Sequence, residues 1–206
     1  MAITHLLKIS RLEGLTDGVF SIAMTIMVLN LHLPNHFNTG DVSPIVQSNI
    51  YINLYMYAGS FIILGTHWIA MNFQWGLLER LNRIYLWTNM FYLMAICVIP
   101  FSANLLVAYP HSIYSINFYA INLLCTSLGQ MITLTCAYYF KLNKNTYRIE
   151  VYRAALLRIL VAPVFYISSL VMTHWSTSIA FILLVLPTAI YLIPGRIDHY
   201  EGVPSS

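Results

Sequence analysis

The chain has 206 residues, of which 59% are hydrophobic and only 8% carry a charge. Ordinary soluble domains carry about 25% charged residues, so this composition excludes a soluble globular domain and predicts an integral membrane protein. The net charge of +3 does not indicate a nucleic-acid partner, because the basic residues lie in short segments beside apolar runs and form no separate basic domain.

The apolar runs predict membrane-spanning helices, since about 20 apolar residues suffice to cross a bilayer. Six spans are predicted, over about residues 12–33, 49–72, 84–108, 115–140, 154–173 and 177–194. Little of the chain remains outside them. We therefore expect an all-α fold with one transmembrane domain over residues 1–206.

The basic residues predict the orientation of these spans. They all fall before the first span, at or between the second and third, at or between the fourth and fifth, or after the sixth: Lys8, Arg11, Arg80, Arg83, Lys141, Lys144, Arg148, Arg153, Arg158 and Arg196. Short loops rich in Lys and Arg stay on the cytoplasmic side. We expect both termini to be cytoplasmic and the protein to span the cell membrane several times.

The first helix begins with charges, which are costly at the edge of hydrocarbon and indicate a partner network or an ion path. Arg11, Glu13 and Asp17 lie within its first turns. Asp17 alone is also consistent with a structural acid, paired with Arg11 of a neighbouring chain or with Asn89.

One face of this helix carries a stripe at helical spacing. At steps of four or three residues, it contains Arg11, Leu15, Gly18, Ile22, Thr25 and Leu29. Ile26 is expected to face away from this stripe. By pattern alone, core packing is the commoner use of such a stripe. In several copies around an axis, its branched side chains would form apolar rings, which gate a pore by dewetting. Gly14 and Gly18 form a G-x-x-x-G pair, which allows another helix to approach closely.

The first helix also resembles a known family. The run Arg11-x-x-x-Leu15-Thr16-Asp17 is similar to the motif Arg-x-x-x-Phe-Ser-Asp of the transmembrane protein 175 family of potassium channels. A second block resembles this family too, in Ser60 to Trp68, Asn89 to Leu93 and Ile99 to Ser102. Together these segments cover the first half of the chain, and the length matches the prokaryotic six-helix form.

The resemblance implies a homotetramer in the lipid bilayer, with the first helices lining a central pore for potassium ions and no cofactor. Ile22 would form the narrow apolar constriction, with Thr25 and Leu29 as further pore-facing layers. The structural network would comprise Arg11, Thr16, Asp17, His67 and Asn89.

Two departures from the family pattern stand out. Leu15 and Thr16 replace the Phe and Ser of the motif, which keeps an apolar group and a hydroxyl. Met71 and Asn72 stand where the family usually has a His pair, which removes a pH response carried by that pair. His67 lies one turn earlier, and we interpret it as a polar side chain bonded inside the bundle, in preference to a titrating substitute for the pair.

We therefore predict a potassium-selective leak channel with a hydrophobic gate. The alternative is a secondary or proton-coupled transporter that uses Asp17 and His67 to bind the driving ion; the lack of an internal repeat speaks against it. An enzyme is not expected, because the sequence contains neither a nucleophile–base arrangement nor a metal-ligand motif such as H-E-x-x-H.

Overall fold

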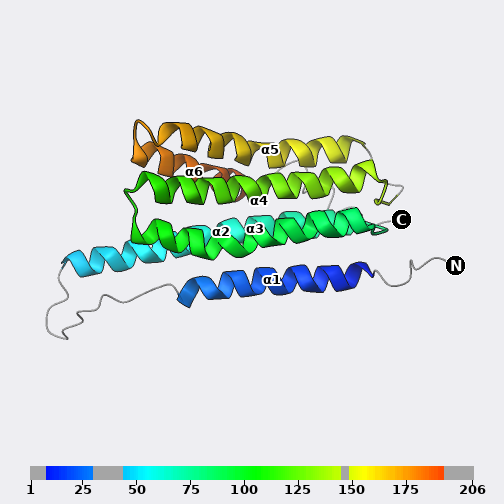
Figure 1. The fold of residues 1–206 in the computed structure, drawn as a ribbon, viewed down its shortest axis with the longest axis horizontal. Coiled ribbons are helices and arrows are strands. Elements are labelled where there is room, and N and C mark those ends of the chain that lie inside the picture. Colours follow the sequence, from blue (N-terminus) through cyan, green and yellow to red (C-terminus); the bar gives the residue numbers. More distant parts are fainter. Residues whose placement is uncertain (1–7, 30–43, 145–148, 193–206) are drawn as a thin grey trace.

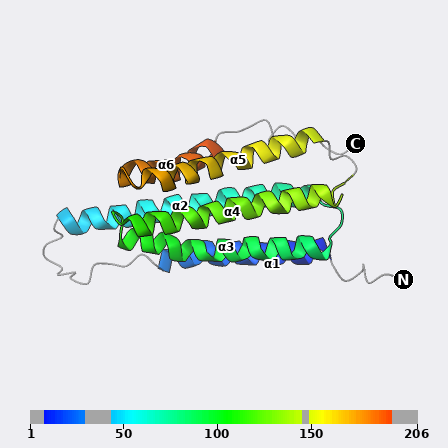
Figure 2. The same cartoon turned by 45° about the horizontal axis from the view of Figure 1, so that its top comes forward.

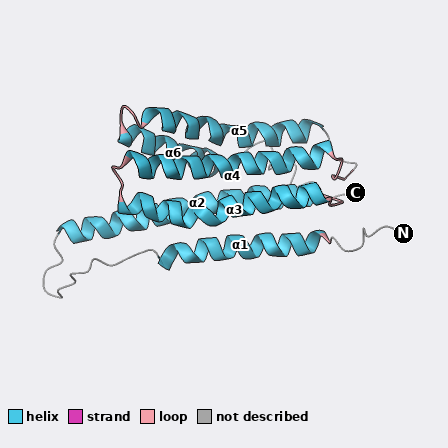
Figure 3. Ribbon diagram, viewed as in Figure 1, coloured by secondary structure: helices cyan, strands magenta, loops and turns pink. Residues whose placement is uncertain are grey.

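The computed structural model describes residues 8–29, 44–144 and 149–192. Within them the chain forms a bundle of helices (Figure 1), namely α1 (Ile9–Leu29), α2 (Pro44–Leu77), α3 (Arg83–Ala108), α4 (Ile113–Tyr139), α5 (Ile149–Met172) and α6 (Thr177–Leu192). The described residues contain no strand, and short loops join α2 to α3, α3 to α4 and α5 to α6 (Figure 3). The predicted all-α fold with six helices is confirmed.

The helix bounds differ from the predicted spans mainly in α2 and α5. Both helices extend beyond the predicted bounds: α2 also covers residues 44–48 and 73–77, and α5 also covers residues 149–153. The predicted ends at residues 33 and 194 lie outside the described residues. Five of the helices are long and apolar enough to cross a membrane, whereas α6 is a shorter apolar helix.

The helices pack with α1 at one edge of the bundle. There α1 contacts α2 and α3, while α3 packs on α4, α4 on α5, and α6 on α5, α4 and α2 (Figure 2). Consequently, within the described residues, α1 packs against other helices mainly on one side. In this edge position its other side is left uncovered by the described part of the chain.

A close backbone approach in the core joins α3 to α4. Gly129 faces Tyr92, which is fully buried, and a Cβ built on Gly129 would lie 3.3 Å from the Cα of Tyr92. Glycine at this position therefore lets the two helices approach closely. Without it, the backbone of α3 would have to move.

Two loops meet at one end of the bundle, which we call the basic end. Backbone amides of Glu79 and Arg80 donate to the carbonyl oxygen of Leu142, and the amide of Lys144 donates to that of Leu77. All Lys and Arg residues of the described ranges lie at this end or in the adjoining turns of α1 and α5: Lys8, Arg11, Arg80, Arg83, Lys141, Lys144, Arg153 and Arg158. This agrees with the segregation of charge on which the orientation was predicted.

Candidate functional site

The first helix has one buried face and one exposed face. Its buried residues recur at steps of three and four and pack against α2 and α3: Leu12, Thr16, Phe20, Ala23 and Met27. On the opposite side Ile22 is 59% exposed and Leu29 is 71% exposed. The predicted stripe therefore does not pack in the core of its own chain. It presents branched apolar side chains to whatever lies beside the chain.

Thr25 lies between these two residues on the exposed face. Its hydroxyl donates to the carbonyl oxygens of Ser21 at 2.9 Å and of Ile22 at 3.0 Å. The helix thus satisfies the hydroxyl proton itself. The lone pairs of the oxygen stay available as a weak acceptor on an otherwise apolar surface.

Consecutive polar residues anchor the basic end of α1 to two different helices. The carboxylate Oδ1 of Asp17 accepts a hydrogen bond from Nε1 of Trp68 on α2 at 2.9 Å. Next to it, Oγ1 of Thr16 accepts from Nδ2 of Asn89 on α3 at 3.4 Å. The two contacts fix the rotation of α1 about its axis, because they hold two adjacent sides of one turn.

The predicted network is therefore divided. Thr16 and Asn89 contact each other, as the network requires, but Asn89 is not the partner of Asp17. Arg11 is exposed and makes no ion pair with any residue of the described ranges. The partner of Asp17 is Trp68, a residue the sequence placed in the family block without a role.

His67 belongs to a different contact. It is buried, and its Nδ1 lies 2.9 Å from Oε1 of Gln130 on α4, so the ring donates to the amide oxygen. The interpretation of His67 as a polar side chain bonded inside the bundle is confirmed. Its ring and that of Phe20 both lie 6.3 Å from the ring of Tyr92, measured between centroids, so an aromatic chain connects His67 to α1.

The Met71 and Asn72 pair shows what replaces the family histidines. Met71 is buried in the core, and Nδ2 of Asn72 donates to the carbonyl oxygen of Trp68 at 3.2 Å. Neither side chain titrates in the physiological range. At these two positions, then, nothing changes charge with pH.

Gly14 and Gly18 make no close contact within the described residues, since a Cβ added to either would meet nothing within 4 Å. The G-x-x-x-G pair is thus not used between helices of one chain. Both glycines remain free on the side of α1 that faces outward.

A groove runs beside Ile22 between α1 and α3. The centre of a water molecule has about 290 Å³ of this groove to occupy, and the groove's walls include Ile22 and Ile26 from α1 and Phe101 from α3. We expected Ile26 to face away from the stripe, and this is wrong: Ile26 is 43% exposed and lines the same groove. The two residues are one turn apart, about 40° around the helix, which is too little to separate them.

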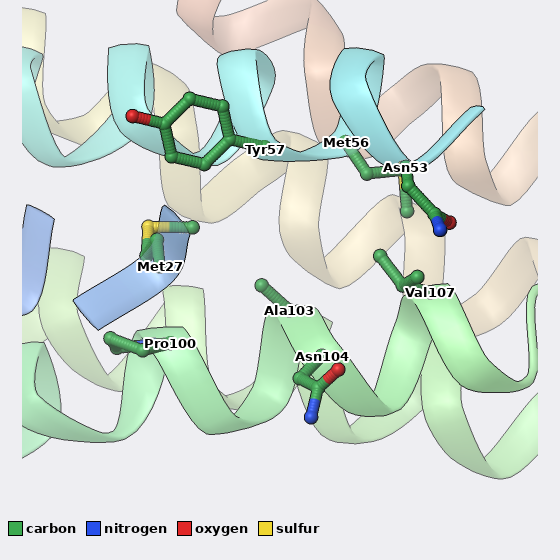
Figure 4. Close-up of a pocket in the computed structure, with 8 residues that line it drawn as sticks. All are labelled: Met27, Asn53, Met56, Tyr57, Pro100, Ala103, Asn104 and Val107. Carbon is green, nitrogen blue, oxygen red and sulfur yellow. The ribbon is translucent and has the colours of Figure 1, made fainter. Parts of the chain in front are cut away.

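A second, smaller cavity lies where the C-terminal half of α1 meets α2 and α3. Figure 4 shows Met27 of α1 opposite Met56 and Tyr57 of α2, with Pro100 and Ala103 of α3 below. The centre of a water molecule has about 20 Å³ of this space to occupy, and the walls are mainly apolar.

The contacts do not bring the residues of the alternative function together. Asp17 bonds to Trp68 on the exposed side of α2, whereas His67 bonds to Gln130 on the buried side. The described residues also contain no group of three His, Cys, Asp or Glu side chains placed to hold a metal ion. No described contact therefore favours an ion-coupled carrier site at Asp17 and His67.

These features define a class, a helical membrane protein with several spans and a peripheral first helix whose outward face is apolar. Residues 11–100 match the family model described as the endosomal/lysosomal potassium channel TMEM175. The resemblance of the chain to the TMEM175 family is therefore confirmed.

Two potassium channels of bacteria also match this chain, each over about half of its length. The chain is 30% identical over 94 residues to a potassium channel of Chryseobacterium sp., which is 46% of each chain. It is 25% identical over 99 residues to one of Streptomyces collinus, which is 48% of each chain. The match thus spans about half the length of these relatives.

The whole fold is similar to a solved structure. A crystal structure of a lysosomal potassium-selective channel TMEM175 homolog from Chamaesiphon minutus superposes with a TM-score of 0.77, covering 89% of this chain and 95% of that one, at 19% sequence identity. The likeness extends the shared fold to helices that the sequence match does not reach.

Proposed function

We propose that the chain is one subunit of a potassium-selective leak channel, a homotetramer in the cell membrane with α1 lining the central pore and both termini in the cytoplasm. The observation that carries the proposal is the free apolar stripe of α1. Ile22 and Leu29 expose more than half of their surface on a helix that lies inside the segment shared with the family. Around a symmetry axis these side chains form rings.

The rings act as the gate and the filter. Ile22 and Leu29 are seven residues apart, hence about 10 Å along the helix, with Thr25 between them. A narrow apolar neck offers water and ions nothing to bond to, so it empties readily. A passing ion must shed part of its hydration there, which costs the weakly hydrated potassium ion less than sodium. Between the apolar rings of Ile22 and Leu29, the hydroxyl oxygen of Thr25 offers a passing ion a weak acceptor.

The remaining contacts hold the neck in place. Asp17 and Thr16 fix the rotation of α1 through Trp68 and Asn89, so that Ile22 keeps facing the axis. Gly14 and Gly18 carry no side chain on the free side of α1, which suits close approach of a neighbouring subunit. Arg11, exposed at the basic end, is free to pair with that neighbour.

Recording from purified protein in a planar bilayer, with potassium on one side and sodium on the other, tests the proposal. We expect unitary currents whose reversal potential favours potassium. A flux that saturates and follows a second ion gradient, with no unitary currents, would instead identify a carrier.

A further inference from the structure

One face of α4 is polar along nearly its whole length although it is buried. The residues recur at steps of three and four: Tyr119, Asn122, Thr126, Gln130 and Thr133. Buried polar side chains need hydrogen-bond partners, and most of this row has them. Tyr119 lies 3.1 Å from the hydroxyl of Ser60, Asn122 lies 2.9 Å from that of Ser102, and Thr126 donates to Leu123.

Two groups on this side of α4 have no hydrogen-bond partner among the residues that the structure describes. They are Nε2 of Gln130 and Oγ of the neighbouring Ser127, whose residues are only 3% and 1% exposed. They lie one turn apart on α4. Gln130 already uses its Oε1 to accept from His67, so only its amide donor is left unpaired.

Both groups border the same small cavity. It lies between α2, α4, α5 and α6, and its wall also includes His67, Thr188 and Tyr191. The centre of a water molecule has about 10 Å³ of this cavity to occupy, which is roughly the space that a single ordered water requires. The cavity therefore has room for one water molecule and several polar groups in its wall.

We propose that this cavity binds one structural water molecule, which accepts a hydrogen bond from Nε2 of Gln130 and shares a second with the hydroxyl of Ser127. The neutral ring of His67, which donates through Nδ1, keeps Nε2 as a further acceptor for the water. A cation does not suit the site, because the free group of Gln130 is a donor. The site exists whether or not the chain conducts potassium.

The water connects the inner helices to the pore helix. It bridges α4 to α2 at His67, and the next residue, Trp68, holds Asp17 of α1. Through this water, the two unpaired groups of α4, Nε2 of Gln130 and Oγ of Ser127, both gain a hydrogen-bond partner. Without it, α4 would carry two orphaned polar groups in the middle of the bundle.

A structure of the wild-type protein at a resolution that reveals ordered water tests the site directly. We expect density at hydrogen-bonding distance, about 2.7–3.2 Å, from Nε2 of Gln130 and Oγ of Ser127. An empty cavity, with the Ser127 hydroxyl turned toward a carbonyl of its own helix, would overturn the proposal.

Thermal unfolding of Ser127→Ala gives an independent test with a definite sign. If water bridges the hydroxyl, the variant loses a hydrogen bond and its midpoint falls. If the cavity is dry, the variant removes an unpaired buried hydroxyl and its midpoint rises. The matched control is Ser168→Ala on α5, whose hydroxyl is satisfied by Val164 of its own helix and which corrects for the higher helix propensity of alanine.

We expect Ser127→Ala to unfold about 2–4 °C below Ser168→Ala, the shift typical of one lost hydrogen bond in a chain of this size. A midpoint equal to or above that of the control would contradict the bound water.

Discussion

The bond between Asp17 and Trp68 makes a prediction about how α1 is held. Trp68→Phe keeps an aromatic ring on α2 but removes the Nε1 donor that lies 2.9 Å from Oδ1 of Asp17. Hydrogen bonds to charged groups contribute about 1.5–3 kcal/mol when shielded, whereas exposed pairs contribute about 0.2–1 kcal/mol. Both side chains are exposed, so we expect the contact to stabilise the fold by about 1 kcal/mol.

The assay is a double-mutant cycle of thermal unfolding with Trp68→Phe, Asp17→Ala and the double variant. Each single change should lower the midpoint by about 2–4 °C, and the double variant should fall little further, because both changes remove the same bond. Trp87→Phe is the matched control, since the indole of Trp87 is exposed on α3 and has no hydrogen bond among the described residues.

Additive effects of the two changes, within about 0.5 kcal/mol, would refute this account of the anchor. The same structure separates Asp17 from Arg11. Arg11→Ala breaks no contact within the described part of the chain, so an effect of this change on the isolated subunit is not expected. Loss of the assembled form in detergent sizing would place the partner of Arg11 in a neighbouring subunit.

Two further predictions concern packing and orientation. Gly129→Ala should destabilise the protein relative to Gly65→Ala, because its new Cβ meets the buried Tyr92 at 3.3 Å while that of Gly65 meets nothing within 4 Å; equal midpoints for the two variants would show that Tyr92 moves aside at no cost. Cysteines introduced at Ser112 and Ser176, at the end of the bundle opposite the basic end, should react with an impermeant reagent added outside cells of a cysteine-free background; labelling from the cytoplasm alone would reverse the predicted topology.

The sequence was sufficient to predict the helices and the stripe on α1, while its exposure came from the structure. Both depend on local periodicity: apolar runs of membrane length define the spans, and the spacing of Ile22, Thr25 and Leu29 defines a face. A helical projection does not reveal what lies beside a face. The separation of Ile26 from Ile22 was a misreading of the projection itself, since the two residues lie only about 40° apart around the helix and line the same groove against α3.

The contacts that hold α1 in place could not be predicted from the sequence. Asp17 and Trp68 are distant in the chain, and no spacing rule pairs a carboxylate with an indole across two helices. The charges of Arg11 and Asp17 predicted a network, but only the packing of α1 on α2 and α3 shows which polar groups meet. The polar row of α4 was not predicted: Asn122, Thr126 and Gln130 share one helical face, but their burial depends on α2 and α3, which His67 and Ser102 bring against them.

The most direct test of the central claim is single-channel recording of Ile22→Asn beside Val28→Asn, both confirmed as tetramers. Val28 is 46% exposed and lies about 120° around the helix from Ile22, so it serves as the control, whereas Ile26 lies too close to Ile22 to do so. Polarising the Ile22 ring should wet and widen the neck, raise the unitary conductance and move the potassium–sodium reversal potential toward zero, while Val28→Asn leaves both near the wild-type values. Wild-type conductance and ion preference in Ile22→Asn would contradict the assignment of α1 as the pore wall.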